Sequence, residues 1–220
     1  GLKTGCVSVV ANDPGGREII RELKLEKIKS FFSIHKDDHT AYSVILVHPN
    51  AERTILSYKG EGQHFEVDAI LWRKLKAKWF FLGSLGGNSD LLQRAFEHAT
   101  TRNFKIAFNP GGKELARGLE KLKPYLAEVD IFSVNLEEAQ GLLKQGAGPA
   151  PPQAIPASRE PSPIHPHRAQ SADLRAAGGP PLGSPAPADT LKELDKLVKG
   201  ITILTLGPEG VLVSDKKNMY

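Results

Sequence analysis

Asn135 and Glu138 are the residues whose types and spacing most directly suit ion chemistry. They follow residues 131–134, an apolar run of strand length. In open α/β sheets ligands bind at the carboxyl ends of the strands, and amide and carboxylate oxygens suit a hydrated Mg²⁺. The same spacing suits a helix cap, because Asn is a favoured cap and a Glu three residues later completes a capping box. The metal-site and cap interpretations are compatible, and both are kept.

A second segment, residues 201–210, joins another apolar run to residues that suit phosphate. Thr205 ends the run with a hydroxyl, and Gly207 and Gly210 follow it. Glycines allow the backbone to approach a phosphate closely and to turn its N–H groups toward it. Without further context, the same glycines indicate an ordinary turn. The segment therefore predicts a phosphate-binding turn or a plain one.

Two other patterns carry weaker functional hypotheses. His35 and His39 flank two aspartates and could bind a metal, but no cysteine or second cluster supports this, so exposure in a polar linker is the favoured interpretation. Trp72 and Trp79 enclose the basic stretch 73–78. A solvated helix leading into a strand explains that stretch better than stacking on nucleic-acid bases does.

The composition limits the classes of partner. The chain has 220 residues, 40% of them hydrophobic, and a net charge of +4, which mildly favours anionic ligands such as nucleotides. Lys and Arg are spread among Asp and Glu, so we expect no nucleic-acid partner. No apolar stretch approaches the length of a membrane span, so we expect no membrane partner. The single cysteine, Cys6, excludes an intrachain disulfide and fits a reducing compartment such as the cytoplasm.

Strands and helices are expected to alternate along most of the chain, which predicts a mostly parallel sheet with helical faces. Apolar runs predict strands at residues 6–10, 79–82, 105–108, 131–134 and 201–206. Helical periodicity predicts helices at about residues 14–29, 89–99, 136–143 and 191–199. Asp13 is placed to cap the first helix, with Pro14 at its first position.

Residues 41–47 and 54–58 are two short β-type runs outside this alternation. A turn joins them, so they predict an antiparallel hairpin, and we expect a small lid of about residues 40–60 that lies outside the main sheet. One face of such a lid must meet solvent or a partner subunit. The hairpin therefore offers a surface for a homodimer.

Residues 146–188 interrupt the pattern. They contain 11 of the chain's 16 prolines, and most of the other residues are Ala, Gly, Ser and Gln. This composition cannot bury enough apolar surface to offset its ordering entropy. We therefore predict a disordered surface insertion that separates residues 1–145 from residues 189–220.

Taken in order, these motifs resemble those of the PfkB (ribokinase-like) family of sugar and nucleoside kinases. The resembling segments are residues 9–16, 40–44, 52–60, 108–111, 135–138 and 205–210. Residues 135–138 are similar to the family's Asn-x-x-Glu motif, which implies that Asn135 and Glu138 organise Mg²⁺ and phosphate through water. Residues 205–210 are similar to its Thr-x-Gly-x-x-Gly element, which implies that Thr205, Gly207 and Gly210 bind ATP.

The resemblance implies an α/β fold with a ribokinase-like, three-layer, Rossmann-like core and a β-hairpin lid, incomplete at both ends. Residues 1–145 and 189–220 would form this core. The family's sugar-binding motif would precede Gly1, and the aspartate base would lie beyond Tyr220, so the catalytic residue is not named here. Ala11 replaces a usual glycine, and the absence of a glutamate near Gly86 counts against ribose as the substrate.

By the same resemblance, the whole enzyme would use ATP and Mg²⁺ to transfer the γ-phosphoryl group of ATP to a sugar hydroxyl. The 220-residue chain alone is expected to be inactive. Two alternatives stay open: a nucleoside (adenosine-type) kinase of the same fold, and a non-catalytic scaffold or sensor that keeps the fold. The expected partner is a small-molecule sugar or nucleoside, and the sequence does not determine which one.

Overall fold

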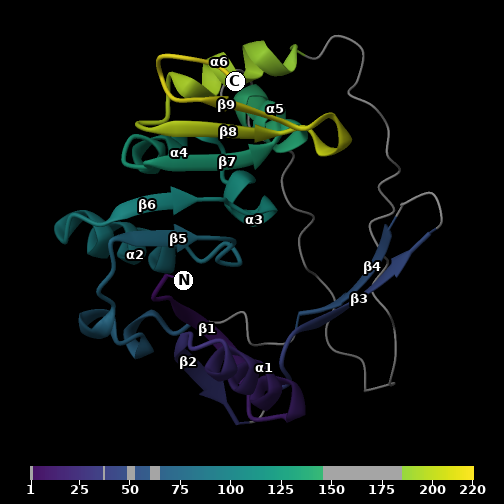
Figure 1. Cartoon of the computed structure of the whole chain (residues 1–220), viewed down its shortest axis with the longest axis vertical. Coiled ribbons are helices and arrows are strands. Elements are labelled where there is room, and N and C mark those ends of the chain that lie inside the picture. Colours follow the sequence, from purple (N-terminus) through teal and green to yellow (C-terminus); the bar gives the residue numbers. More distant parts are fainter. Residues whose placement is uncertain (1, 37, 49–52, 60–64, 146–184) are drawn as a thin grey trace, which may run out of the picture.

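A computed structural model describes residues 2–36, 38–48, 53–59, 65–145 and 185–220 (Figure 1). Its centre is a five-stranded sheet with strand order β5-β6-β7-β8-β9. The strands are β5 (Trp79–Leu82), β6 (Lys105–Phe108), β7 (Ile131–Asn135), β8 (Ile201–Thr205) and β9 (Val211–Ser214). β5 to β8 are parallel, and β9 pairs antiparallel with β8. The predicted α/β fold with a mostly parallel sheet is confirmed.

Helices cover one face of this sheet in the described part of the chain. They are α2 (Ser89–Thr101), the short α3 (Gly112–Leu115), α4 (Leu119–Leu126), α5 (Leu136–Gln145) and α6 (Pro187–Asp195). Alternate strand residues such as Phe132 and Leu204 are fully buried beneath the helices, and each contributes about 1.5–3 kcal/mol relative to exposure. Residues of the other register face away from them, and Phe81 is 74% exposed.

A second, smaller unit contains the first helix. β1 (Gly5–Ala11) and β2 (Lys29–His35) form a parallel pair, with α1 (Pro14–Leu25) between them in sequence. The Asp13 side chain accepts a hydrogen bond from the Gly16 N–H at 2.7 Å, and Pro14 is the first helical residue. The predicted cap is therefore confirmed.

The first helix ends earlier than the sequence predicted. Lys27 has a φ of 58°, in the left-handed region, and the Ile28 N–H donates to the Leu23 carbonyl at 2.8 Å. This arrangement is a Schellman motif, which ends a helix. The prediction of a helix to about residue 29 was wrong, because the apolar Ile28 belongs to the turn before β2. β2 itself was not predicted, and its last residue, His35, was placed in a polar linker.

The hairpin was predicted correctly as a separate unit. β3 (Tyr42–Val47) and β4 (Arg53–Tyr58) pair antiparallel, from Tyr42 opposite Tyr58 to Val47 opposite Arg53. They form a two-stranded sheet of their own. In Figure 1 the hairpin extends on the side toward which β5–β8 point.

Several boundaries differ from the sequence prediction. α6 begins at Pro187, four residues before the predicted start, because proline is favoured in a first helical turn. The stretch after Trp72 forms only a 3₁₀ turn, Trp72–Lys74, in place of the predicted helix. β9, α3 and α4 were not predicted. Pro187 and Ala188, placed in the predicted insertion, belong to α6. Residues 146–184 lie outside the described residues, so the disordered insertion stays a prediction there.

Candidate functional site

A hollow of about 440 Å³ lies at the carboxyl ends of the parallel strands. Register places Asn135 at the end of β7 directly beside Thr205 at the end of β8. The residues that line this hollow, called the pocket below, are Phe81, Asn109, Ser133, Val134, Asn135, Glu138 and Thr205. The structure therefore brings together three of the residues that the sequence selected, from segments 70 residues apart.

Asn135 and Glu138 form the capping box that their spacing allowed. The Asn135 N–H donates to Glu138 Oε2 at 3.0 Å, and the Glu138 N–H donates to Asn135 Oδ1 at 2.8 Å. Neither hydrogen bond uses Glu138 Oε1 or the Asn135 amide nitrogen. Because α5 starts at Leu136, the box holds both side chains against the pocket. The cap leaves atoms of both residues able to meet a ligand.

The two glycines of the second segment lie beyond the pocket lining. Gly207 and Gly210 have φ values of 60° and 102°, which favour glycine. The Gly210 N–H donates to the Gly207 carbonyl at 3.2 Å, and the Leu206 N–H donates to the Gly210 carbonyl at 2.8 Å. An ideal Cβ at either glycine would meet no atom within 4 Å. Backbone conformation therefore explains these glycines here, and of this segment only Thr205 lines the pocket.

Asn109 and Phe81 are lining residues that were not assigned to the site from the sequence. The Asn109 side-chain amide donates to the Ser133 carbonyl at 2.7 Å, and the Asn109 backbone N–H donates to the Leu82 carbonyl at 2.9 Å. These bonds tie the end of β6 to both neighbouring strands. The signal for Asn109 was its position at the end of an apolar run, which is the same signal that selected Asn135.

Glu114 is a buried carboxylate that no pattern in the sequence marks out. It is 1% exposed and lies in α3, directly after the loop that follows β6. It accepts backbone N–H bonds from Leu85 at 3.2 Å, Gly87 at 2.6 Å and Gly111 at 2.9 Å. The Ser84 hydroxyl donates to it at 3.3 Å. These bonds join the loops after β5 and β6.

Comparison with solved structures identifies the fold. No family model and no curated sequence matches the chain. The E. coli ribokinase II structure with ATP and Mg²⁺ matches at TM-score 0.69 and 16% identity, over 100% of this chain and 62% of that one. Adenosine kinase from Sinorhizobium meliloti matches at TM-score 0.71 and 16% identity, over 100% and 58%. This chain has the ribokinase-like (PfkB) fold. Fructokinase from Halothermothrix orenii matches at TM-score 0.64 and 18% identity, over 100% and 68%.

The fold implied by the motif resemblance is thereby confirmed. The chain spans about three fifths of the length of the ribokinase II and adenosine kinase structures. At these identities the likeness concerns the fold, and the roles of individual residues must be argued from this chain's own geometry.

A second polar network, formed by Asp13, Gly16 and Thr40, lies at the foot of the hairpin. Three hydrogen bonds to its carboxylate, first from the Thr40 hydroxyl and then from the N–H groups of Gly16 and Thr40, lower the pKa of Asp13 to about 2. A hollow of about 880 Å³ opens beside it. It lies between α1 and the start of β3, and Ile19, Tyr42 and Tyr58 are among its lining residues.

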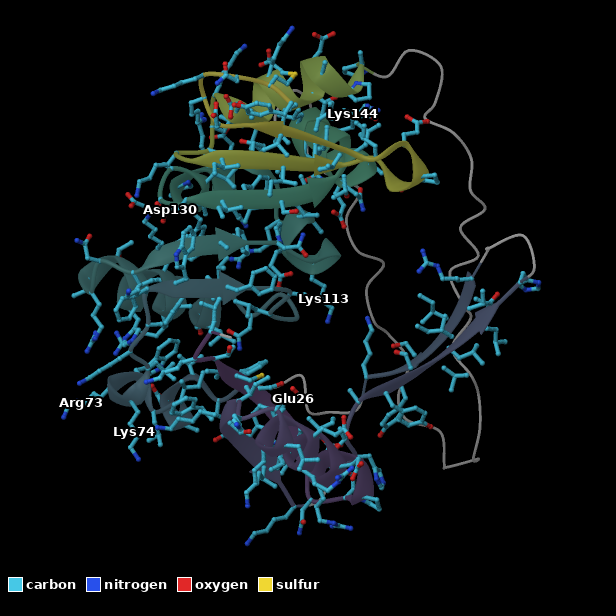
Figure 2. The ribbon with its side chains drawn as sticks, viewed as in Figure 1. Glu26, Arg73, Lys74, Lys113, Asp130 and Lys144 are labelled. Carbon is cyan, nitrogen blue, oxygen red and sulfur yellow. The ribbon has the colours of Figure 1, made fainter. Side chains whose placement is uncertain are left out.

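Of the weaker sequence candidates, Trp72 has a structural role. Trp72 packs against His98 with ring centroids 5.4 Å apart, and its Nε1–H donates to the Val67 carbonyl at 2.9 Å. Arg73 and Lys74 project outward, away from the edge of the sheet where Lys113 lies (Figure 2). Within the described ranges, no group of three His, Cys, Asp or Glu residues could hold a metal. No helix among the residues described has the length and apolarity needed to cross a membrane.

Proposed function

We propose that this chain forms the nucleotide-binding part of a PfkB-type kinase, which transfers the γ-phosphoryl group of ATP to a sugar hydroxyl. One observation carries the proposal: Asn135, Glu138 and Thr205 meet in one pocket at the carboxyl edge of a ribokinase-like sheet. This edge is where open α/β folds bind their ligands.

The donor atoms at the pocket fit a magnesium-bound polyphosphate. Mg²⁺ keeps several of its waters and is usually held by one or two carboxylates together with substrate phosphates. Glu138 Oε1 carries no hydrogen bond within the described part of the chain, and it is the carboxylate oxygen that could hold such a water. When bound, Mg²⁺ would neutralise part of the negative charge of the phosphates.

The side chains of the pocket would position the phosphates and would not react themselves. The Asn135 amide and the Thr205 hydroxyl can donate hydrogen bonds to phosphate oxygens, and the cap fixes the direction of the amide. Phosphoryl transfer depends mainly on such positioning and on electrostatic stabilisation. Among the described lining residues Glu138 is the only carboxylate, and its Oε2 is held by a backbone N–H. The general base is therefore not assigned to a lining residue.

The hairpin is proposed as the lid of this site and as the contact of a homodimer. It extends toward the carboxyl side of the sheet (Figure 1), where closure would exclude water from the phosphates. Its two strands expose Tyr42, Val44, Ile45, Leu46, Val47, Ile55, Leu56 and Tyr58. A second copy would protect this apolar surface and its unpaired strand edges.

A nucleoside is the second candidate acceptor. Phe81 lines the pocket and is 74% exposed, so its ring offers a face on which a base could stack. The fold match to adenosine kinase, at TM-score 0.71, is consistent with this candidate. Binding of sugars and nucleosides to this chain in the presence of Mg·ATP, measured by calorimetry, distinguishes the two acceptors without requiring turnover.

Binding of Mg·ATP to this chain tests the proposal directly. We expect saturable binding by calorimetry, weakened about 10–100-fold in Glu138→Gln because a group that holds the hydrated metal loses its charge. Glu120→Gln is the matched control, since Glu120 is an exposed carboxylate on α4 and is not among the residues that line the pocket. If wild type does not bind Mg·ATP, or both variants bind it as wild type does, the proposal is wrong.

A further inference from the structure

The loop after β5 has the backbone form of an anion site. Gly86 and Gly87 have φ values of 68° and 81°, so two successive residues are left-handed. Such conformations turn neighbouring N–H groups toward one point, and proteins use them to bind phosphate. Here the N–H groups of Leu85 and Gly87 both point at Glu114 Oε1. The anion in this loop is thus a side chain of the protein itself.

The loop after β6 contributes the remaining donors. Glu114 Oε2 accepts from the Gly111 N–H at 2.9 Å and from the Ser84 hydroxyl at 3.3 Å. Both carboxylate oxygens are therefore engaged, and the side chain is 1% exposed. A buried carboxylate is tolerated only when hydrogen bonds replace its lost water. This set of donors meets that condition.

The two loops pack closely against each other. A Cβ on Gly111 would overlap the Ser84 side chain, and one on Gly87 would lie 3.0 Å from Lys113 Cβ. Phe81 and Asn109, which form one wall of the pocket, are three and two residues upstream of Ser84 and Gly111. Glu114 thus joins the two loops that directly follow these lining residues.

We propose that Glu114 is a positioning residue that fills the anion site of the 84–87 loop and fixes the Phe81–Asn109 wall. External phosphate is then excluded from this loop and directed to the Asn135–Thr205 end of the pocket. The direction of phosphate to the Asn135–Thr205 end rests on the proposed function. The filling of the 84–87 loop by Glu114 concerns only this chain and inorganic anions. A carboxylate that only stabilised the contact between the two loops would not control where phosphate binds.

Phosphate titration of the ¹⁵N-labelled chain, followed by NMR at constant ionic strength, tests the inference. In wild type, the amide chemical shifts of Leu85, Gly87 and Gly111 are expected to stay unchanged when inorganic phosphate is added. In Glu114→Ala they are expected to shift saturably, and phosphate or formate should recover part of the lost melting temperature. The Asn109 side-chain amide signal should move in the variant and return toward its wild-type position on saturation.

Two results would overturn the inference: wild-type amides of this loop that respond to phosphate, or Glu114→Ala amides that do not. Glu120→Ala, which removes an exposed carboxylate on α4, is the control and should behave as wild type. The titration needs no nucleotide. If wild type fails to bind Mg·ATP, the proposed function fails, while the phosphate data still decide the role of Glu114.

Glu114→Gln is the second variant, for the case in which the alanine variant does not fold. It keeps the side-chain volume but replaces one acceptor oxygen by an NH₂ group that cannot accept. Hydrogen exchange at the three loop amides should then be at least about tenfold faster, because their acceptors are weakened or lost. Exchange at Phe132, in the centre of the sheet, should stay unchanged. Unchanged exchange at the loop amides would contradict the inference.

Discussion

Asp13 and Thr40, 27 residues apart, are joined at the foot of the hairpin by two hydrogen bonds. The Thr40 hydroxyl donates to Asp13 Oδ1 at 2.6 Å, and the Thr40 N–H donates to Asp13 Oδ2 at 2.9 Å. The hydroxyl oxygen also accepts the Ala11 N–H at 3.0 Å. Because Tyr42 begins β3 two residues later, this pair fixes the point from which the hairpin leaves the core.

The first prediction concerns acid stability. The pKa of Asp13 is lowered from an ordinary value of 3.8 to about 2 in the folded chain. The folded state therefore binds the proton more weakly than the unfolded state, so this carboxylate stabilises the fold above about pH 4 and the contribution is lost as pH falls toward 2. Urea unfolding at pH values between 2 and 6 should show a smaller acid loss in Asp13→Asn. Asp68→Asn, at an exposed position, should retain the wild-type profile, and an identical profile for Asp13→Asn would contradict the prediction.

The second prediction isolates the Thr40 hydroxyl. Thr40→Val keeps the shape of the side chain but leaves the N–H of Ala11, which is 3% exposed, without its acceptor. An unsatisfied buried donor costs about 1–3 kcal/mol, and urea unfolding should show a loss of that size. Thr40→Ser retains the hydroxyl and should lose less. A loss in Thr40→Val no larger than the loss in Thr40→Ser would contradict the prediction, because the hydroxyl would then contribute no more than the methyl group.

A third prediction compares two helical glycines. A Cβ at Gly16, in the first turn of α1, would overlap the carbonyl oxygen of Ala11, whereas a Cβ at Gly141, in α5, would meet nothing within 4 Å. We expect Gly16→Ala to destabilise the chain by about 1–3 kcal/mol, as overpacking does. Gly141→Ala should stabilise it by about 0.5–1 kcal/mol, since alanine loses less backbone entropy in a helix. Thermal and urea unfolding measure both, and a tolerated Gly16→Ala would refute the close approach of α1 to β1.

The fourth prediction tests the proposed homodimer. Val44 and Leu46 lie on one face of β3, while Ser43 lies on the other. If that apolar face contacts a second copy, light scattering should give a dimer mass at micromolar concentration, and Val44→Asp should give a monomer. Ser43→Asp adds the same charge to the opposite face, which carries Ile45 and Val47, and so shows which of the two faces makes the contact. A monomeric wild type would remove the dimer proposal and leave the lid proposal intact.

The sequence by itself was sufficient for the parts of the site that depend on strand ends. An apolar run followed by polar residues marks the end of a parallel strand, and parallel strands end at one edge. The pattern places Asn135, Glu138 and Thr205 at or just after the ends of two strands, and in the structure all three line one pocket. The Asp13 cap could also be predicted from the sequence, because its partner Gly16 is only three residues away.

Only the tertiary structure decided the contacts that span many residues. Glu114 stands between Lys113 and Leu115 like any solvated helical glutamate, and its burial follows from a loop 27–30 residues earlier. β2 was missed for a related reason: its pairing with β1, and not local periodicity, makes residues 29–35 a strand. Local sequence specifies propensity and caps, whereas the energy of a buried carboxylate or a strand pair depends on groups that folding alone brings into contact.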